Sequence, residues 1–233
     1  MIKKNDFIEI DFTAKIKDGN IFDTTIANEA KKAEIFNEKQ DYKPLQICVG
    51  QGMVIKGLDS ALEGKEIGRE YVIDIEPEQA FGKRNPSLIK TMPLSVFKEK
   101  EVMPYPGLVL NMDGLIVRVA SVSGGRVIAD FNNPLAGKKV NYKFNIKKEI
   151  TDKKEKLLTL IEFYLKLNDK DVEIENNIIT IKDKNIASRI LASKKLIKFF
   201  VDKIKELLNL DIELKEKEQK QAKEKEQKKE LKV

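Results

Sequence analysis

The sequence predicts an α+β protein in which a part rich in strands is followed by a helical extension. Three observations carry this prediction. Several segments within the first 150 residues alternate apolar and polar residues, as half-buried strands do. Between about Arg84 and Asn132, four prolines precede strands rich in Val and Ile, which is typical of a separate small domain. From Thr151 onward, apolar residues recur at helical spacing.

These changes of pattern divide the chain into three predicted domains. Residues 1–84 and 132–150 form the first domain, and residues 85–131 form a small β-rich domain inserted into it. Residues 151–233 form a C-terminal α+β extension that ends in a charged tail.

The first domain is expected to contain five strands, at residues 7–16, 21–24, 45–49, 70–76 and 140–146. The turn signal Lys17-Asp18-Gly19-Asn20 separates the first two. Residues 26–41 carry Ile26, Ala30 and Ala33 at helical spacing and read as a short amphipathic insertion. Residues 54–62 predict a short helix that ends before Gly64. For the sheet to close, the last strand must pair with the N-terminal half.

The C-terminal extension is expected to hold a helix from Thr151, two short strands at 172–174 and 178–181, and a second long helix over residues 186–208. Beyond Leu214 few apolar residues remain, and pairs such as Glu213 and Lys217, or Glu216 and Lys220, favour a solvated helix or a disordered tail. Two helices and a hairpin make a thin core for about 60 residues. We therefore expect part of this surface to be buried in a homodimer formed through the C-terminal domain.

Composition limits the chemistry that the chain can perform. It has 233 residues, no histidine and one cysteine, Cys48, which lies in a predicted strand and is expected to be buried. Without histidine, the usual general base and the commonest transition-metal ligand are missing, so we expect no metal and no cofactor. The two glycines of Gly50-Gln51-Gly52 lack the further residues of a phosphate-binding loop.

Charge and hydropathy indicate where the protein acts. The 44 basic residues are mixed with 38 acidic ones, which is typical of a solvated surface and argues against a nucleic-acid groove. A nucleic-acid or ribosomal partner for the lysine-rich tail stays open as a minor alternative. No apolar run is long enough to span a membrane, and the N-terminus lacks the apolar core of a secretion signal. We expect a cytoplasmic protein.

Several motifs, in the right order, resemble the FKBP family of prolyl isomerases. They are Phe22-Asp23, the segment VGQGMVIKGLDSAL at 49–62, Gly64-Lys65-x-x-Gly68, Ala80-Phe81-Gly82 and Asn133-Pro134-Leu135-Ala136-Gly137. The insert in place of the family's flap loop looks like the SlyD-like subgroup, and the insertion at 26–41 with the C-terminal extension looks like its long archaeal members. The resemblance covers about residues 1–150. It implies an antiparallel, half-wrapped sheet around one short helix, with a pocket between them.

The resemblance also implies which residues line that pocket. Asp23, Ile55, Phe81 and Tyr142 would act on the prolyl bond, Asp23 through its carboxylate and Ile55 through its backbone N–H. Substrate would contact Phe12, Phe22, Leu45, Val54, Leu58 and Leu135. The chain departs from the family's pattern in three places: Leu58 stands where some members carry Trp, Phe81 stands where a Tyr hydroxyl would bind the substrate carbonyl, and the metal-binding tail rich in His and Cys is missing. Nickel handling is therefore not expected.

Prolyl isomerisation suits a chain without histidine, because rotation about the bond breaks no covalent bond. The barrier is amide resonance of about 18–20 kcal/mol, and an apolar pocket favours the twisted state. We therefore expect an isomerase acting on unfolded, proline-containing polypeptides, with chaperone activity from the insert. The alternative is a non-catalytic holdase, since two familiar aromatic features are missing. Taken singly, the apolar residues of the pocket are ordinary core residues.

Overall fold

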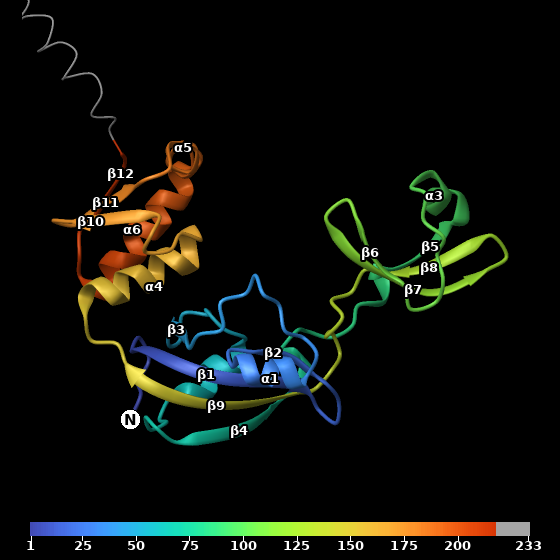
Figure 1. Ribbon diagram of the computed structural model, residues 1–233, viewed down its shortest axis with the longest axis horizontal. Helices are drawn as coiled ribbons and strands as arrows, with labels where there is room; N and C mark the ends of the chain where they lie inside the picture. The colour runs from blue at the N-terminus through green and yellow to red at the C-terminus, as the bar shows by residue number, and fades with distance from the viewer. Residues whose placement is uncertain (218–233) are drawn as a thin grey trace, which may run out of the picture. The chain divides into compact units, whose positions relative to one another are not determined.

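The computed structural model describes residues 1–217 and has the predicted α+β composition (Figure 1). Contacts within the chain divide it into two units. The N-terminal unit comprises Met1–Ile2, Ile10–Leu45 and Val54–Lys147. The C-terminal unit comprises Lys3–Glu9, Gln46–Met53 and the chain from Lys148 onward. The second unit therefore contains two short segments from the strand-rich first part of the sequence.

The principal sheet has five strands: β1 (Phe7–Ile16), β2 (Ile21–Thr24), β3 (Leu45–Cys48), β4 (Glu70–Ile75) and β9 (Val140–Glu149). Their order is β2-β1-β9-β4, and β3 also pairs with β1. The prediction that the last strand pairs back with the N-terminal half is confirmed, since β9 lies between β1 and β4. Burial alternates along β1 and β9, so every second side chain enters the core.

Two helices and one 3₁₀ turn accompany this sheet. They are α1 (Ala27–Lys32), α2 (Lys56–Leu62) and η1 (Pro77–Gln79). Helix α1 is much shorter than the amphipathic insertion predicted over residues 26–41. It ends because Glu34 adopts a positive φ of 58° and Phe36 stacks on Tyr42, with ring centroids 5.1 Å apart, in an ordered loop.

The insert forms a four-stranded sheet of order β5-β8-β7-β6. Its elements are η2 (Pro86–Leu88), β5 (Ile89–Pro93), α3 (Leu94–Glu99), β6 (Val109–Met112), β7 (Leu115–Ser123) and β8 (Arg126–Asp130). Phe97 of α3 is fully buried with Val117, Val119 and Val127. Helix α3 was not predicted, because its six residues are too few to show a helical period.

Polar contacts join the two segments of the chain that lead into and out of the insert. Arg84 forms an ion pair with Asp130, and the Asn85 N–H donates to the Asn132 side chain at 2.7 Å. Asn132 also donates through its side chain to Asp130 at 2.7 Å. Asp130 and Asn132 are both buried, so this neck is a fixed part of the fold.

The C-terminal unit packs three helices against a small sheet. Its elements are α4 (Lys153–Leu165), β10 (Val172–Glu175), β11 (Ile178–Ile181), α5 (Lys184–Ala192), α6 (Lys194–Leu208) and β12 (Glu213–Glu216). Strand β12 pairs in parallel with β11, and β10 pairs with β11 in antiparallel fashion. Its core combines Phe200 and Ile204 of α6 with Phe7, Cys48 and Ile150 from outside the helices.

Two predictions for this unit are wrong in detail. The second long helix is broken at Ser193, whose ψ of 79° separates α5 from α6. Glu213 lies in a strand instead of a solvated helix, and Lys217 pairs with Glu173 at 2.8 Å instead of with Glu213. Parallel pairing with a distant strand leaves no local signal in the sequence. The remainder of the charged tail, residues 218–233, lies outside the described residues.

Candidate active site

Four aromatic side chains that are far apart in the sequence meet in the N-terminal unit. The Phe12 and Tyr142 ring centroids lie 5.6 Å apart. Phe22 meets Phe81 edge to face at 5.6 Å and Tyr142 at 6.2 Å. Phe12 and Tyr142 are buried, while Phe22 and Phe81 are half-buried. This aromatic cluster contains four of the residues that the sequence analysis placed in a pocket.

Local structure explains how these rings converge. The alternation of β1 and β9 turns Phe12 and Tyr142 inward. Strand β2 is fastened to β1 by hydroxyl groups: Thr24 donates to the Phe12 carbonyl at 2.9 Å, and the Phe12 N–H donates to the Thr25 hydroxyl at 3.0 Å. These two hydroxyl groups tie the chain to β1 directly after Phe22 and Asp23. The sequence analysis gave them no role, although two hydroxyl residues directly after Phe22-Asp23 were the available signal.

Asp23 is the acidic residue of this site. It is half-buried, and burial raises the pKa of its carboxyl group, while a hydrogen bond from the Thr24 backbone opposes that shift. Burial, and then the nearby charge of Asp23, raise the pKa of the Tyr142 hydroxyl. Tyr142 therefore stays protonated at neutral pH. The site offers one carboxylate and one neutral hydroxyl among aromatic rings.

The start of α2 holds three further predicted residues. Val54 and Ile55 are half-buried, and Leu58 is 1% exposed. Ile55 precedes the first helical residue, and its carbonyl accepts a hydrogen bond from the Asp59 N–H at 3.0 Å. Gly57 lies against β4: a methyl group added there would fall well inside the contact distance of Ile75 Cγ2. The glycine therefore permits the close packing of α2.

Leu135 and Leu45 are the remaining predicted contacts. The loop that holds Leu135 is tied to the segment of Phe81, because the Gly137 N–H donates to the Gly82 carbonyl at 2.8 Å. Leu135 is half-buried there. Leu45 is the first residue of β3 and is 37% exposed. The joint role of all these residues in binding substrate stays a prediction.

Two kinds of feature are absent from the described residues. Within residues 1–217, no group of three or more His, Cys, Asp or Glu side chains is placed to hold a metal ion. In the same part of the chain, no helix is both long and apolar enough to cross a bilayer. An apolar site with one carboxylate suits a reaction that breaks no covalent bond.

Comparison with known proteins assigns the family. The family model described as FKBP-type peptidyl-prolyl cis-trans isomerase matches residues 1–98, and the model described as the IF domain of FKBP26 matches residues 90–135. A short-type peptidyl-prolyl cis-trans isomerase of Methanocaldococcus jannaschii is 34% identical over 63% of this chain and 92% of its own length. The chain belongs to the FKBP-type peptidyl-prolyl cis-trans isomerase family.

Further relatives carry the same activity in their names. The FKBP-type isomerase SlyD of Haemophilus influenzae is 24% identical over 60% of this chain and 68% of its own length. The FKBP-type 16 kDa isomerase of Escherichia coli K12 is 26% identical over 62% of this chain and 91% of its own length. Among solved structures, the three FKBP domains of wheat FKBP73 match at a TM-score of 0.33 and 17% identity, over 64% of this chain and 40% of that one.

Family membership confirms the predicted resemblance and enzyme class: the protein is a peptidyl-prolyl cis-trans isomerase. The match to an IF domain supports the SlyD-like character of the insert. In these three relatives, the alignment spans 144 to 154 residues and covers 60% to 63% of this chain. More than a third of this chain therefore lies outside each of these alignments.

Proposed function

We propose that the aromatic cluster around Asp23 is the site where the FKBP-type protein isomerises prolyl bonds of unfolded chains. The observation that supports it most is the cluster formed by the rings of Phe12, Phe22, Phe81 and Tyr142, with the half-buried Asp23 near enough to Tyr142 to raise the pKa of its hydroxyl. A twisted prolyl bond carries less charge separation than a planar amide. An apolar surround therefore stabilises the twisted state relative to the ground state.

The residues divide the work by their chemistry. The rings and the apolar side chains of Val54 and Leu58 enclose the proline and exclude water. The Asp23 carboxylate interacts with the backbone of the substrate, and the Ile55 N–H donates to its carbonyl. Phe81 has no hydroxyl to offer, so the carbonyl depends more on Ile55.

A tetrapeptide assay tests this site. Tyr142→Leu keeps an apolar side chain but removes the ring that faces Phe12 and Phe22. We expect kcat/KM on an Ala-Pro peptide to fall about tenfold, which corresponds to about 1.4 kcal/mol of transition-state stabilisation. Tyr71→Leu is the matched control, because that ring stacks on Phe144, at 5.5 Å, in the same sheet. Equal losses for both variants would show that the sheet and not the site was damaged.

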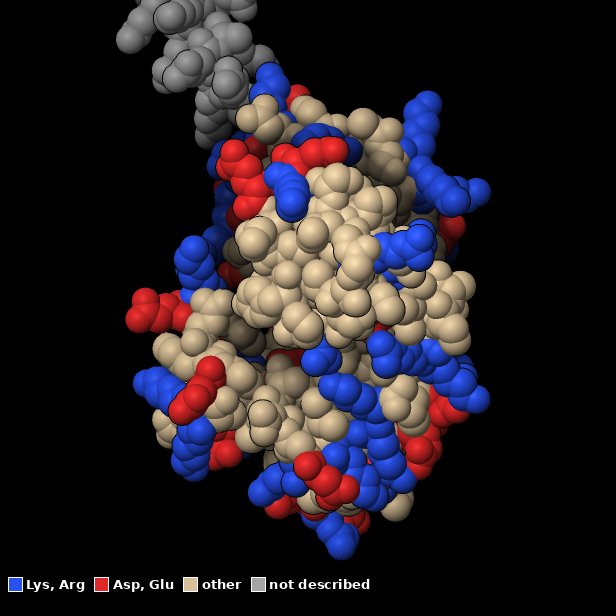
Figure 2. All heavy atoms as spheres, turned by 90° about the vertical axis from the view of Figure 1, so that its right-hand side faces the viewer, with Lys and Arg blue, Asp and Glu red and all other residues tan. Residues whose placement is uncertain are grey.

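The insert, residues 85–131, is proposed as the chaperone part of the protein, joined to an isomerase domain of residues 1–84 and 132–150. Its strands bury Val117 and Val127. Successive side chains of a strand point to opposite faces, so the adjacent residues Ile116 and Ile128 face outward and are 56% and 38% exposed. Met103 and Tyr105, in the loop before β6, are 79% and 60% exposed. Figure 2, in which the insert faces the viewer, shows a broad area without charged side chains. Such a surface fits apolar segments of unfolded polypeptides.

Charged substitutions separate the two activities. Ile116→Lys with Ile128→Lys should slow the refolding of a protein limited by prolyl isomerisation and leave tetrapeptide turnover unchanged. Val72→Lys is the control, because Val72 is 60% exposed but belongs to the principal sheet. Unchanged refolding by the double variant would rule out the insert as the binding surface.

A cytoplasmic homodimer formed through residues 151–233 is the last part of the proposal. Most of the apolar stripe of α6 is already covered, since Phe200 and Ile204 are fully buried. Phe199 stays 47% exposed and meets Tyr164 edge to face, so it is the residue that a second copy would cover. Phe199→Asp should halve the mass measured by light scattering. A monomeric wild-type protein would refute the dimer.

A further inference from the structure

The segment Gln46–Met53 leads directly into the start of α2, yet it packs with the C-terminal unit. It consists of the end of β3 and a turn in which Gly50 and Gly52 both have positive φ, of 79° and 67°. Met53 is joined by one peptide bond to Val54, and Ile55 follows. The backbone N–H of Ile55, which the proposed site uses, therefore lies two residues after this segment.

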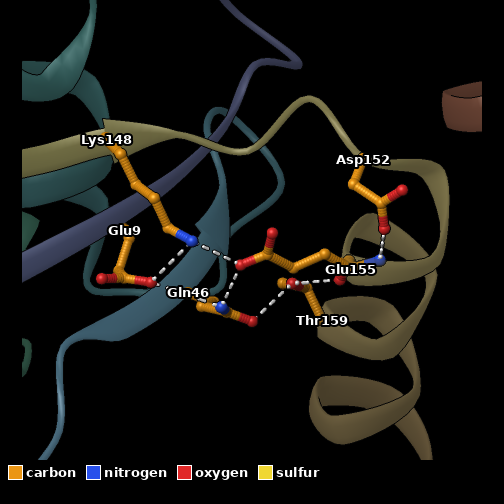
Figure 3. A network of polar contacts seen from close by, with 6 residues as sticks. All are labelled: Glu9, Gln46, Lys148, Asp152, Glu155 and Thr159. Carbon is orange, nitrogen blue, oxygen red and sulfur yellow. Dashed lines mark hydrogen bonds and ion pairs between the residues drawn. The ribbon is translucent and has the colours of Figure 1, made fainter.

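Gln46 fastens the first end of the segment to α4 (Figure 3). Its amide nitrogen donates to Glu155 at 2.8 Å, and its amide oxygen accepts from the Thr159 hydroxyl at 3.2 Å. Lys148 also binds Glu155 at 2.8 Å, and it forms a longer ion pair with Glu9 at 3.5 Å. Thr159 is 2% exposed, so the network is shielded from water on the helix side.

Apolar packing holds the middle. Cys48 is fully buried in the core that α4 and α6 build, and Met53 packs against the same core. The Cys48 N–H donates to the Met53 sulfur at 3.2 Å, which closes the turn between them. The turn is thus built on side chains of the C-terminal unit.

Gln51 fastens the other end to α6. Its amide oxygen accepts from Lys203 Nζ at 3.1 Å, and its amide nitrogen donates to the Asn5 side chain at 2.8 Å. Lys203 is held in turn by Glu206, at 2.9 Å. Both glutamines of the segment therefore use both ends of their amides.

We propose that Gln46 and Gln51 are positioning residues for the isomerase, through which α4 and α6 fix the segment that precedes Ile55. The C-terminal unit would then contribute to turnover without touching substrate. This inference rests on the proposed function, because it takes the Ile55 N–H as a donor to the substrate carbonyl. Displacing such a donor by even a fraction of an ångström weakens its contact with the reacting group.

Lys203→Met in the full chain is the decisive variant, since it removes the α6 contact and keeps the apolar stem. We expect kcat/KM on an Ala-Pro tetrapeptide to fall about threefold to tenfold, and the amides of residues 50–55 to exchange faster with solvent. Lys205→Met is the matched control: Lys205 lies on the same helix but pairs with Asp211, at 2.7 Å. It should change neither measurement.

Substitutions in the segment complete the test. Gln46→Leu and Gln51→Leu should repeat the effect of Lys203→Met, whereas Gln51→Glu retains an acceptor for Lys203 and should keep most of the activity. The proposal is overturned if the Leu variants and Lys203→Met lower the melting temperature but leave kcat/KM and amide exchange at residues 50–55 unchanged.

The two proposals can fail separately. If the wild-type protein does not isomerise the peptide, or Tyr142→Leu has no effect, the proposed site is wrong. Amide exchange at residues 50–55 then still decides whether Lys203, Gln46 and Gln51 fix this segment. Faster exchange in Lys203→Met but not in Lys205→Met supports the fixation, and equal exchange in both refutes it.

Discussion

Gly57→Ala offers a quantitative test of how closely α2 packs on the sheet. Alanine in a helix interior is normally more stable than glycine, by about 0.5–1 kcal/mol. At Gly57 the added methyl group would overlap Ile75 Cγ2 and lie 3.3 Å from both the Cβ and the carbonyl oxygen of Gln79. Ile75 is 4% exposed in β4 and cannot swing into solvent.

The expected sign is therefore reversed. Overpacking a well-filled core costs about 1–3 kcal/mol, which exceeds the helix gain. The net loss of about 0.5–2 kcal/mol should appear in thermal unfolding as a drop of a few degrees. Since α2 must move away from β4, Ile55 shifts with it, and tetrapeptide turnover should fall as well. Ser60→Ala, on the exposed side of the same helix, is the control and should not destabilise the protein.

A second substitution locates the clash. Ile75→Ala alone should cost about 2–5 kcal/mol because it leaves a cavity. In that background Gly57→Ala fills part of the cavity and should stabilise the protein. If Gly57→Ala is as stable as Ser60→Ala, or costs the same in both backgrounds, the argument from Ile75 is wrong.

Three other substitutions test the electrostatics and the second core. Burial raises the pKa of the Asp23 carboxyl group above its ordinary value of 3.8. The folded state therefore loses stability as the pH rises from 3.8 through the raised pKa. Melting curves should show Asp23→Asn gaining stability relative to wild type across that pH window and not below it. Burial acts to raise the pKa of Asp130, but hydrogen bonds from Asn132 and the Arg84 guanidinium outweigh it and lower that pKa below 3.8. The stability that Asp130 contributes is present above pH 3.8 and is lost as the pH falls through the lowered pKa. Asp130→Asn should therefore be less stable than wild type at about pH 6, and its stability should fall no further than that of wild type as the solution is acidified. Phe200→Ala should cost about 3–5 kcal/mol in chemical unfolding, because Phe200 is fully buried, whereas Phe199→Ala should cost far less.

Local alternation was sufficient to predict the strands of the first domain, and the family resemblance was sufficient to single out the residues of the aromatic cluster. Alternation along 7–16 and 140–146 identified β1 and β9, and the resemblance carried by the ordered motifs implied Phe12, Phe22, Phe81 and Tyr142 as pocket residues. The motifs succeed because each one fixes a local conformation. The convergence of the rings then follows from the order of strands in the sheet.

The missed features depend on partners that are distant in the sequence. Strand β12 exists because it pairs with β11, and Ser193 breaks a helix whose apolar period continues on both sides. The core of the C-terminal unit is larger than the sequence after Thr151 indicates. Phe7 and Cys48 also belong to it, and they come from strands that precede it by about 100 residues or more. No window of the C-terminal sequence carries that information.

Phe7, Cys48 and Gln51 contact helices that follow them by about 100 residues or more, which has a consequence during synthesis. A ribosome adds residues in order, so residues 3–9 and 46–53 emerge long before α4 and α6 can form. Until about residue 204 has been added, the core that contains Cys48 is missing Ile204, and Gln51 is missing the hydrogen bond from Lys203. In the nascent chain, Phe7 and Cys48 therefore stay without their complete core until α6 has been made.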